Sequence, residues 1–337
     1  MIKFVLLFLL ALSSCRSTES SNVRSFRSYR PTTNEVVDTK LAFFPNDIPY
    51  RIEKIKFELD GPRYHESYSY RVVLPELNQV DILAIKEMYS SWSATQTKVK
   101  FFQDSEGPHY LVDFLPPLFQ YLEGKNYVMD WLNSPGLGSV RQKVFTNCWT
   151  TVYAIYKQAL DQSSSFSAFY AGTSLPEHLL ENNNVHVVEE IPATSDVDSQ
   201  TESAGSEKEL KILRELSKPG DLLLFVGLDQ FNQEYSKPVH LAILIDPNLV
   251  FEKPGYRPEH MSRFELTSNV LNRYRSYKKV LLRNSSSSWP DEQLIIDEEN
   301  RRQGSQVYRS INFELKFDEK GYVKKAVPVD VIPDQLR

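Results

Sequence analysis

The chain has 337 residues, which is enough for one large domain or two modest ones. Apolar residues make up 41% and charged residues 25%, an ordinary balance for a globular protein. The net charge is −5 at pH 7, so the chain has no basic excess to neutralise phosphates. We therefore expect no nucleic-acid partner.

Residues 1–15 have the layout of a secretory signal peptide. Lys3 supplies a positive start, residues 4–12 are an unbroken apolar run, and two serines precede Cys15. The run is about half the ~20 apolar residues that a membrane-spanning helix needs. The end of this segment, Leu-Ser-Ser-Cys, resembles the bacterial lipobox, which implies a lipid on Cys15. An ordinary cleaved signal is the alternative.

This resemblance implies a protein of the bacterial cell envelope, held at a membrane by its N-terminal lipid. The outer membrane is preferred over the inner one, and the protein would face the periplasm or the surface. Residues 16–38 are rich in Ser, Thr and Arg and show little periodicity. That composition predicts a flexible tether between the anchor and the folded part.

Residues 39–125 predict a β-rich accessory region. Segments of β-forming residues with partial two-residue alternation predict strands at 50–59, 68–74 and 97–102. A broad apolar face predicts a short helix at 79–91. The apolar stretch 110–123 contains two adjacent prolines, which predict a turn into a short helix.

Residues 126–290 predict a second region in which helices precede strands. Apolar spacing and capping residues predict helices at 148–160, from Ser174 to Leu180, and around 210–216. The small, polar and acidic segment 192–208 predicts a mobile surface insertion. Apolar runs predict strands at 221–227, 239–245, 249–253 and 277–283.

The tail, residues 291–337, predicts a C-terminal β-hairpin extension. Alternating residues indicate strands at 307–317 and 322–329, joined by a turn that ends in Gly321. The chain as a whole is therefore expected to be an α+β protein.

Cys148 is the first residue with the context of a reactive group. Thr146 and Asn147 are both good N-cap residues, and either one puts Cys148 and Trp149 in the first helical turn. Free backbone N–H groups and the helix dipole stabilise a thiolate there, and they can also receive an oxyanion. Asn147 and Trp149 are thus candidates for the cap and the oxyanion site. A buried structural cysteine is the alternative.

His240 lies inside a predicted central strand, where a histidine is often just a satisfied core residue. Glu252 follows twelve residues later, across the turn Asp-Pro-Asn at 246–248. A tight antiparallel hairpin centred near residue 246 brings positions 240 and 252 nearly opposite, on a shared face if no bulge intervenes. Glu252 then orients the imidazole of His240. The alternative for Glu252 is a surface carboxylate paired with Lys253 or Arg257.

The order of these features resembles the NlpC-type family of bacterial cell-wall cysteine peptidases, a branch of the papain-like superfamily. Members have a Cys at a helix start, then Pro-Gly-Asp before an apolar strand, a histidine strand and a third polar residue. Here Pro-Gly-Asp stands at 219–221 and His-Leu-Ala-Ile-Leu at 240–244. Glu252 replaces the usual His, Asn or Gln, and Asn147-Cys148-Trp149 departs from the usual Asp-Cys-Ser. The resemblance covers residues 126–285.

The resemblance implies a papain-like core, in which a helix that carries Cys148 packs on an antiparallel sheet that carries His240. It implies a catalytic set of Cys148, His240 and Glu252, with a peptidoglycan peptide or another amide or acyl compound as substrate. A catalytically silent envelope protein that binds wall peptides or protein partners is the alternative. No metal-ligand spacing is present, so we expect neither a metal nor a cofactor. Asp221 is expected to shape a turn.

Overall fold

The structure is a computed structural model of the chain. It describes residues 31–57, 67–76, 78–89, 98–104, 107–113, 147–161, 165–168, 174–193, 202–228, 235–254, 262–286, 289–304, 311–317, 319 and 323–328. The expected signal peptide with Cys15 and most of the expected tether lie outside these residues. The expected short helix after Pro116 also lies outside them.

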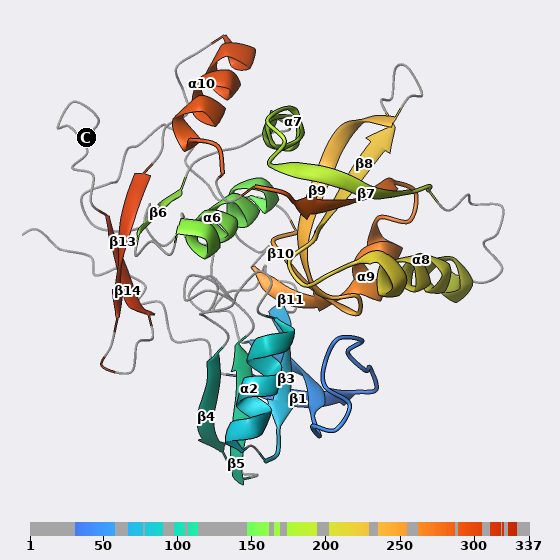
Figure 1. Cartoon of the computed structure of the whole chain (residues 1–337), viewed down its shortest axis with the longest axis vertical. Coiled ribbons are helices and arrows are strands. Elements are labelled where there is room, and N and C mark those ends of the chain that lie inside the picture. Colours follow the sequence, from blue (N-terminus) through green and yellow to red (C-terminus); the bar gives the residue numbers. More distant parts are fainter. Residues whose placement is uncertain are drawn as a thin grey trace, which may run out of the picture.

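The described residues of the N-terminal part form an antiparallel sheet of five strands in the order β1-β2-β3-β5-β4, with helix α2 beside it (Figure 1). The helix begins after Asn78, whose side chain and the carboxylate of Asp81 cap each other's backbone N–H groups. The elements are β1 (Pro31–Val37), β2 (Arg51–Phe57), β3 (Ser67–Leu74), α2 (Gln79–Met88), β4 (Lys98–Asp104) and β5 (Gly107–Asp113).

The expected tether is wrong at its C-terminal end, because residues 31–37 are the edge strand β1. This strand pairs along its length with β2, from Pro31 opposite Phe57 to Val37 opposite Ile52. The segment reads Pro-Thr-Thr-Asn-Glu-Val-Val, and its β-branched threonines and valines favour a strand. The prediction of a tether followed the polar composition of residues 16–38 as a whole and overlooked the β-forming residues at 31–37.

The second and largest sheet has six antiparallel strands in the order β11-β10-β9-β8-β12-β7. Strands β8 and β9 lie near its centre, as their continuous apolar sequences predict. The strands are β7 (Val185–Ile191), β8 (Leu222–Leu228), β9 (Tyr235–Asp246), β10 (Leu249–Glu252), β11 (Arg263–Leu266) and β12 (Lys278–Asn284).

Helices cover both faces of this sheet (Figure 1). Helix α6 packs on one face, where Leu222, Leu241 and Ile243 point, and α8 and α9 pack on the other, beneath Leu223 and Ala242. The alternation follows from the two-residue period of a strand. The helices of this part are α6 (Cys148–Asp161), α7 (Ser174–Glu181), α8 (Glu202–Leu216) and α9 (Thr267–Arg273).

The sequence did not indicate several of the shorter or partly polar elements, among them β5, β6, β7, β11 and α9. The expected insertion at 192–208 is wrong from Glu202 onward, because α8 already begins there. Its first turns contain Ala204, Glu207 and Lys208, which are good helix formers despite the polar composition.

The C-terminal hairpin is confirmed, but it is not a separate extension. Strand β13 (Ile311–Phe317) pairs with β14 (Val323–Pro328) and, on its other edge, with β6 (Ser165–Ala168). This third sheet therefore joins the tail to the segment that follows α6. A helix that the sequence did not predict, α10 (Glu292–Gln303), precedes the hairpin, capped by Asp291 and ended by Gly304.

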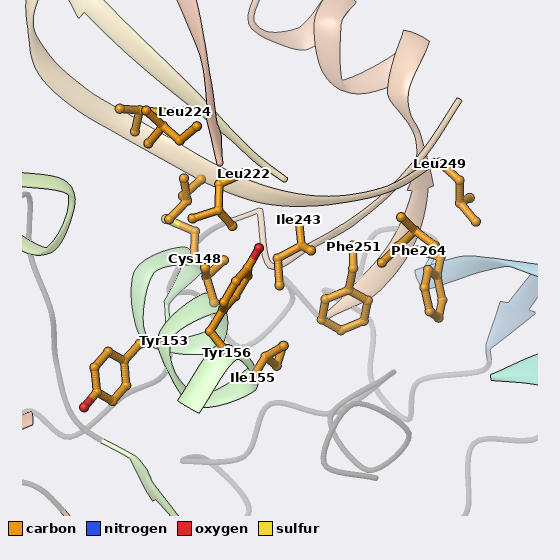
Figure 2. Packing of buried hydrophobic residues seen from close by; sticks show 14 of the residues in the cluster. Cys148, Tyr153, Ile155, Tyr156, Leu222, Leu224, Ile243, Leu249, Phe251 and Phe264 are labelled. Atoms are coloured by element: carbon orange, nitrogen blue, oxygen red, sulfur yellow. The ribbon is translucent and has the colours of Figure 1, made fainter. Parts of the chain in front are cut away.

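One hydrophobic core connects the N-terminal sheet to α6 and the large sheet. Residues of β2 and β3, such as Ile52 and Val72, belong to the same cluster as Ile155 and Ile243. Figure 2 shows the part of this core in which residues of α6, such as Ile155 and Tyr156, lie beside Leu222, Ile243 and Phe251 of the large sheet. The boundary expected near residue 125 thus does not separate two cores. Among the described residues, no helix is both long and apolar enough to cross a membrane.

A buried carboxylate adds a polar connection between these parts. Asp246, at the end of β9, is fully buried and accepts hydrogen bonds from the backbone N–H groups of Ala42 and Phe43 at 3.0 and 2.7 Å. It also accepts one from the N–H of Asn248 at 2.9 Å, and so shapes the β9–β10 turn. One side chain therefore fixes both the hairpin and the segment before β2.

Candidate active site

The start of α6 holds Cys148 in a well-defined helical turn. Asn147 is the N-cap, because its Oδ1 accepts a hydrogen bond from the N–H of Thr150 at 3.0 Å. Thr150 Oγ1 accepts one from the N–H of Asn147 at 2.8 Å, which completes a reciprocal cap. The carbonyl of Asn147 accepts the first helical bond, from Thr151. Helix geometry then leaves the N–H groups of Cys148 and Trp149 without intrahelical acceptors.

The strands β9 and β10 bring His240 and Glu252 together. Nε2 of His240 lies 2.9 Å from Oε2 of Glu252. The two residues are diagonal neighbours rather than directly opposite, because Phe251 pairs with Ile243. The register shifts between Leu249 and Val250, and this bulge puts the even-numbered residues of the two strands on one face. The expected pairing is therefore confirmed, although its register is different.

The imidazole of His240 contacts both other candidates. Burial alone lowers its pKa, but the interactions of the imidazole with the side chains of Cys148 and Glu252 outweigh this and raise the pKa to about 9. Because Glu252 occupies Nε2, the other ring nitrogen, Nδ1, is the one available to the thiol. The structure thus places the side chains of Cys148 and Glu252 close to the same imidazole, with a hydrogen bond to Glu252.

Glu252 is fully buried and ionised. Burial raises the pKa of its carboxyl group, but His240 and then Arg273 and Arg263 lower it to about 2. A carboxylate has no proton to give, so Nε2 of His240 must be the donor in their hydrogen bond. The alternative of a surface carboxylate is wrong, because the side chain of Glu252 is 0% exposed.

Aromatic rings fix the plane of the imidazole. The ring of His240 stacks on Tyr274 with centroids 4.9 Å apart and planes 12° apart, and Phe225 packs nearby at 5.7 Å. The site is enclosed, since Cys148 is 5% exposed and His240 only 1%. Such packing leaves the ring little freedom to turn away from the thiol.

Sequence reasoning missed the residues that surround His240 and Glu252. Arg263, Glu265, Arg273 and Tyr274 come from β11, α9 and the turn after it, none of which the sequence indicated in this role. No spacing relative to His240 identifies them, because their positions depend on how β11 pairs with β10. Arg257, one expected partner of Glu252, lies outside the described residues.

Asp221 has the expected structural role. Its carboxylate accepts a hydrogen bond from the N–H of Lys218 and forms a two-pronged ion pair with Arg283, at 2.9 and 2.7 Å. Gly220, just before it, has φ +90°, a conformation that a residue with a side chain adopts only under strain. The Pro-Gly-Asp segment therefore forms a tight turn into β8.

Comparison of the chain with protein-family models, with curated proteins and with solved structures found no match.

Proposed function

We propose that this protein is a cysteine hydrolase, a peptidase or amidase, built on a papain-like core of the NlpC type. The observation that supports this most directly is that the His240 imidazole interacts with the side chain of Cys148 and is hydrogen-bonded to Glu252 at 2.9 Å. A nucleophile, a base and an orienting acid in that order are the elements of cysteine-dependent acyl transfer. The position of Cys148 at a capped helix start adds a donor site for an oxyanion.

In the proposed reaction the Cys148 thiolate attacks the carbonyl carbon of an amide or ester, and His240 holds the proton taken from the thiol. The N–H groups of Cys148 and Trp149 donate to the oxyanion. The intermediate collapses as His240 gives its proton to the leaving amine or alcohol, and a thioester forms. Water, deprotonated by His240, then attacks the thioester, releases the acid and restores the thiol.

The substrate we propose is a stem peptide of peptidoglycan, which follows from the resemblance to the cell-wall peptidases. Other amides and acyl esters suit the same chemistry. The proposed reaction uses only side chains and backbone groups of this chain, with no cofactor. The ionised carboxylate of Glu252 stabilises the imidazolium form of His240, which forms once in each half of the reaction.

Replacing His240 by alanine is the direct test. In the full-length Cys15→Ser chain Cys148 is the only cysteine, so a thiol-directed probe reports on it alone. We expect the parent chain to label faster than a model thiol. We expect His240→Ala to label slower by a factor on the order of 100, because the thiol loses its base and its charged partner.

His186→Ala is the matched control, because His186 lies exposed on β7. We expect that variant to label at the rate of the parent chain. Equal labelling of the parent chain and His240→Ala would refute the proposal of an activated thiol.

The low exposure of the site favours one second candidate. Cys148 and His240 are 5% and 1% exposed, so only a small part of the site is open to solvent. A catalytically silent envelope protein that binds wall peptides or protein partners would tolerate such an enclosed site. Incubation with peptidoglycan fragments distinguishes the two, since only the hydrolase releases cleaved peptides and loses this activity in Cys148→Ser.

The location that we propose for this activity is the bacterial cell envelope, with Cys15 as the lipid-bearing residue. Several acyl chains on one cysteine hold a protein stably at a bilayer, because each buried CH₂ contributes ~0.8 kcal/mol. We expect Cys15→Ser to abolish retention of the protein in the membrane fraction. Wild-type protein that fractionates as a soluble exported chain would contradict the anchor.

A further inference from the structure

Two arginines and two carboxylates form a cluster behind the candidate site. Arg263 and Glu265 belong to β11, Arg273 is the last residue of α9, and Glu252 ends β10. The side chains of Glu252 and Glu265 are both 0% exposed, whereas those of Arg263 and Arg273 are 15% and 32% exposed. The arginines are therefore partly exposed cations that pair with two fully buried carboxylates.

Each arginine has one close carboxylate. Arg273 Nη1 lies 2.7 Å from Oε1 of Glu252, whereas Arg263 Nη2 lies 3.4 Å from the same oxygen. The order is reversed at Glu265, where Arg263 Nη2 is 2.9 Å and Arg273 Nη2 is 3.4 Å from Oε2. Charge-assisted hydrogen bonds shorten to ~2.7–2.9 Å, so the short contacts are the strong ones. Arg273 is therefore the main partner of Glu252.

The two oxygens of Glu252 have separate tasks. Oε1 accepts from Arg273, and Oε2 faces Nε2 of His240 at 2.9 Å. A carboxylate held at one oxygen cannot rotate without breaking that bond, so the direction of Oε2 depends on Arg273. The guanidinium also adds positive charge beside the buried carboxylate, and burial without such charge would favour the protonated acid.

Arg273 also contacts Glu265, and that second carboxylate is itself held in place by hydrogen bonds. Glu265, which contacts it, accepts hydrogen bonds from Asn269 Nδ2 at 2.8 Å and from the Tyr68 hydroxyl at 2.7 Å. Tyr68 lies on β3, so the N-terminal sheet contributes to this support. A planar guanidinium between two fixed carboxylates has a defined orientation, which a flexible ammonium would not have.

We propose that Arg273 is a positioning residue: by holding Oε1 of Glu252, it directs Oε2 at the His240 imidazole. Its importance for turnover rests on the proposed hydrolase function. Its effect on the hydrogen bond between His240 and Glu252 does not depend on that function. An experiment can therefore test the positioning role of Arg273 separately from the hydrolase proposal. The role differs from a purely structural ion pair because it acts on the state of one imidazole nitrogen.

The test compares Arg273→Gln with Arg273→Lys in the full-length Cys15→Ser chain. The first readout is the resonance of the Nε2 proton of His240, measured by NMR with labelled histidine and assigned by its loss in His240→Ala. The second is the labelling rate of Cys148. We expect Arg273→Gln to lose or strongly broaden the proton resonance and to slow labelling about 10-fold. Arg273→Lys should retain part of the proton resonance and part of the labelling rate. Lysine keeps the positive charge but lacks the planar set of N–H donors of a guanidinium.

Arg283→Gln is the matched control. Arg283 pairs with the buried carboxylate of Asp221 and is 24% exposed, close to the 32% of Arg273, but it lies on β12 and contacts neither Glu252 nor His240. We expect Arg283→Gln to lose stability yet to keep the proton resonance and the labelling rate. Circular dichroism checks that each variant is folded. If Arg273→Gln does not fold, the proton resonance and the labelling rate are measured in Arg273→Lys instead.

An Arg273→Gln variant with the parent resonance and labelling rate would overturn the proposal. Equal losses in Arg283→Gln would overturn it too, because they would show a general effect of losing a buried ion pair. If the parent thiol labels no faster than a model thiol, the hydrolase proposal fails. The proton resonance of His240 still decides the role of Arg273 in that case.

Discussion

Replacing Glu252 by alanine is expected to lower the free energy of unfolding by about 3–5 kcal/mol, the usual cost of removing one partner from a buried ion pair. The side chain of Glu252 is 0% exposed and contacts His240, Arg273 and Arg263. Its loss leaves a buried imidazolium and one guanidinium without their main acceptor. Urea unfolding of wild type and Glu252→Ala at neutral pH measures the difference.

Glu252→Gln is the control that separates charge from shape, because an amide oxygen can still accept from Nε2 of His240. Burial of Glu252 raises its pKa, but His240 and the arginines bring it down from the usual 4.5 to about 2. The ionised carboxylate therefore stabilises the fold above about pH 4.5, and this contribution is lost as the pH falls towards 2. The stability difference between wild type and Glu252→Gln should shrink over that interval. A difference that stays constant would contradict an ionised Glu252.

Replacing Asp246 by alanine is expected to cost roughly 3 kcal/mol or more. Asp246 accepts three backbone hydrogen bonds in a fully buried position, and each donor left unpaired there costs about 1–3 kcal/mol. The loss should also be local. Hydrogen exchange at the amides of Ala42 and Phe43 should accelerate more than exchange in β8, because those amides lose their acceptor.

Asp246→Asn is the variant to compare with Asp246→Ala, because asparagine keeps one acceptor oxygen and loses the second. We expect an intermediate stability, with protection retained at one of the two amides. If Asp246→Ala left exchange at residues 42 and 43 unchanged, the hydrogen bonds would not be what holds this segment to the hairpin.

The sequence was sufficient to predict the central part of the fold because local patterns determine it. The apolar runs of β8 and β9, the capped start of α6 and the hairpin of β9 and β10 each follow from neighbouring residues. The spacing of His240 and Glu252 predicted their contact. The bulge at Leu249 that produces their register has no sequence signal in this chain, since its residues suit a regular strand equally well.

The rest of the site depends on contacts between distant segments. Arg273 reaches Glu252 only because β11 pairs with β10 and α9 follows it, and no local pattern specifies that pairing. Tyr68 reaches Glu265 from a strand almost 200 positions earlier, |i−j| being 197. Asp246 was interpreted only as a turn residue, although its carboxylate also binds the backbone of residues 42 and 43. Composition misled at β1 and at the start of α8, where short local signals lie within polar stretches.

The third sheet has a consequence for how the chain acquires its structure during synthesis. Strand β6 follows the helix of Cys148 directly, but its partner β13 is made only after all six strands of the large sheet. Until then β6 has an unpaired edge, a feature that invites pairing with other chains. In a ribosome-bound or partly exported chain, the helix of Cys148 is thus followed by a strand without its partner. The edge of β6 is paired once β13 has been made.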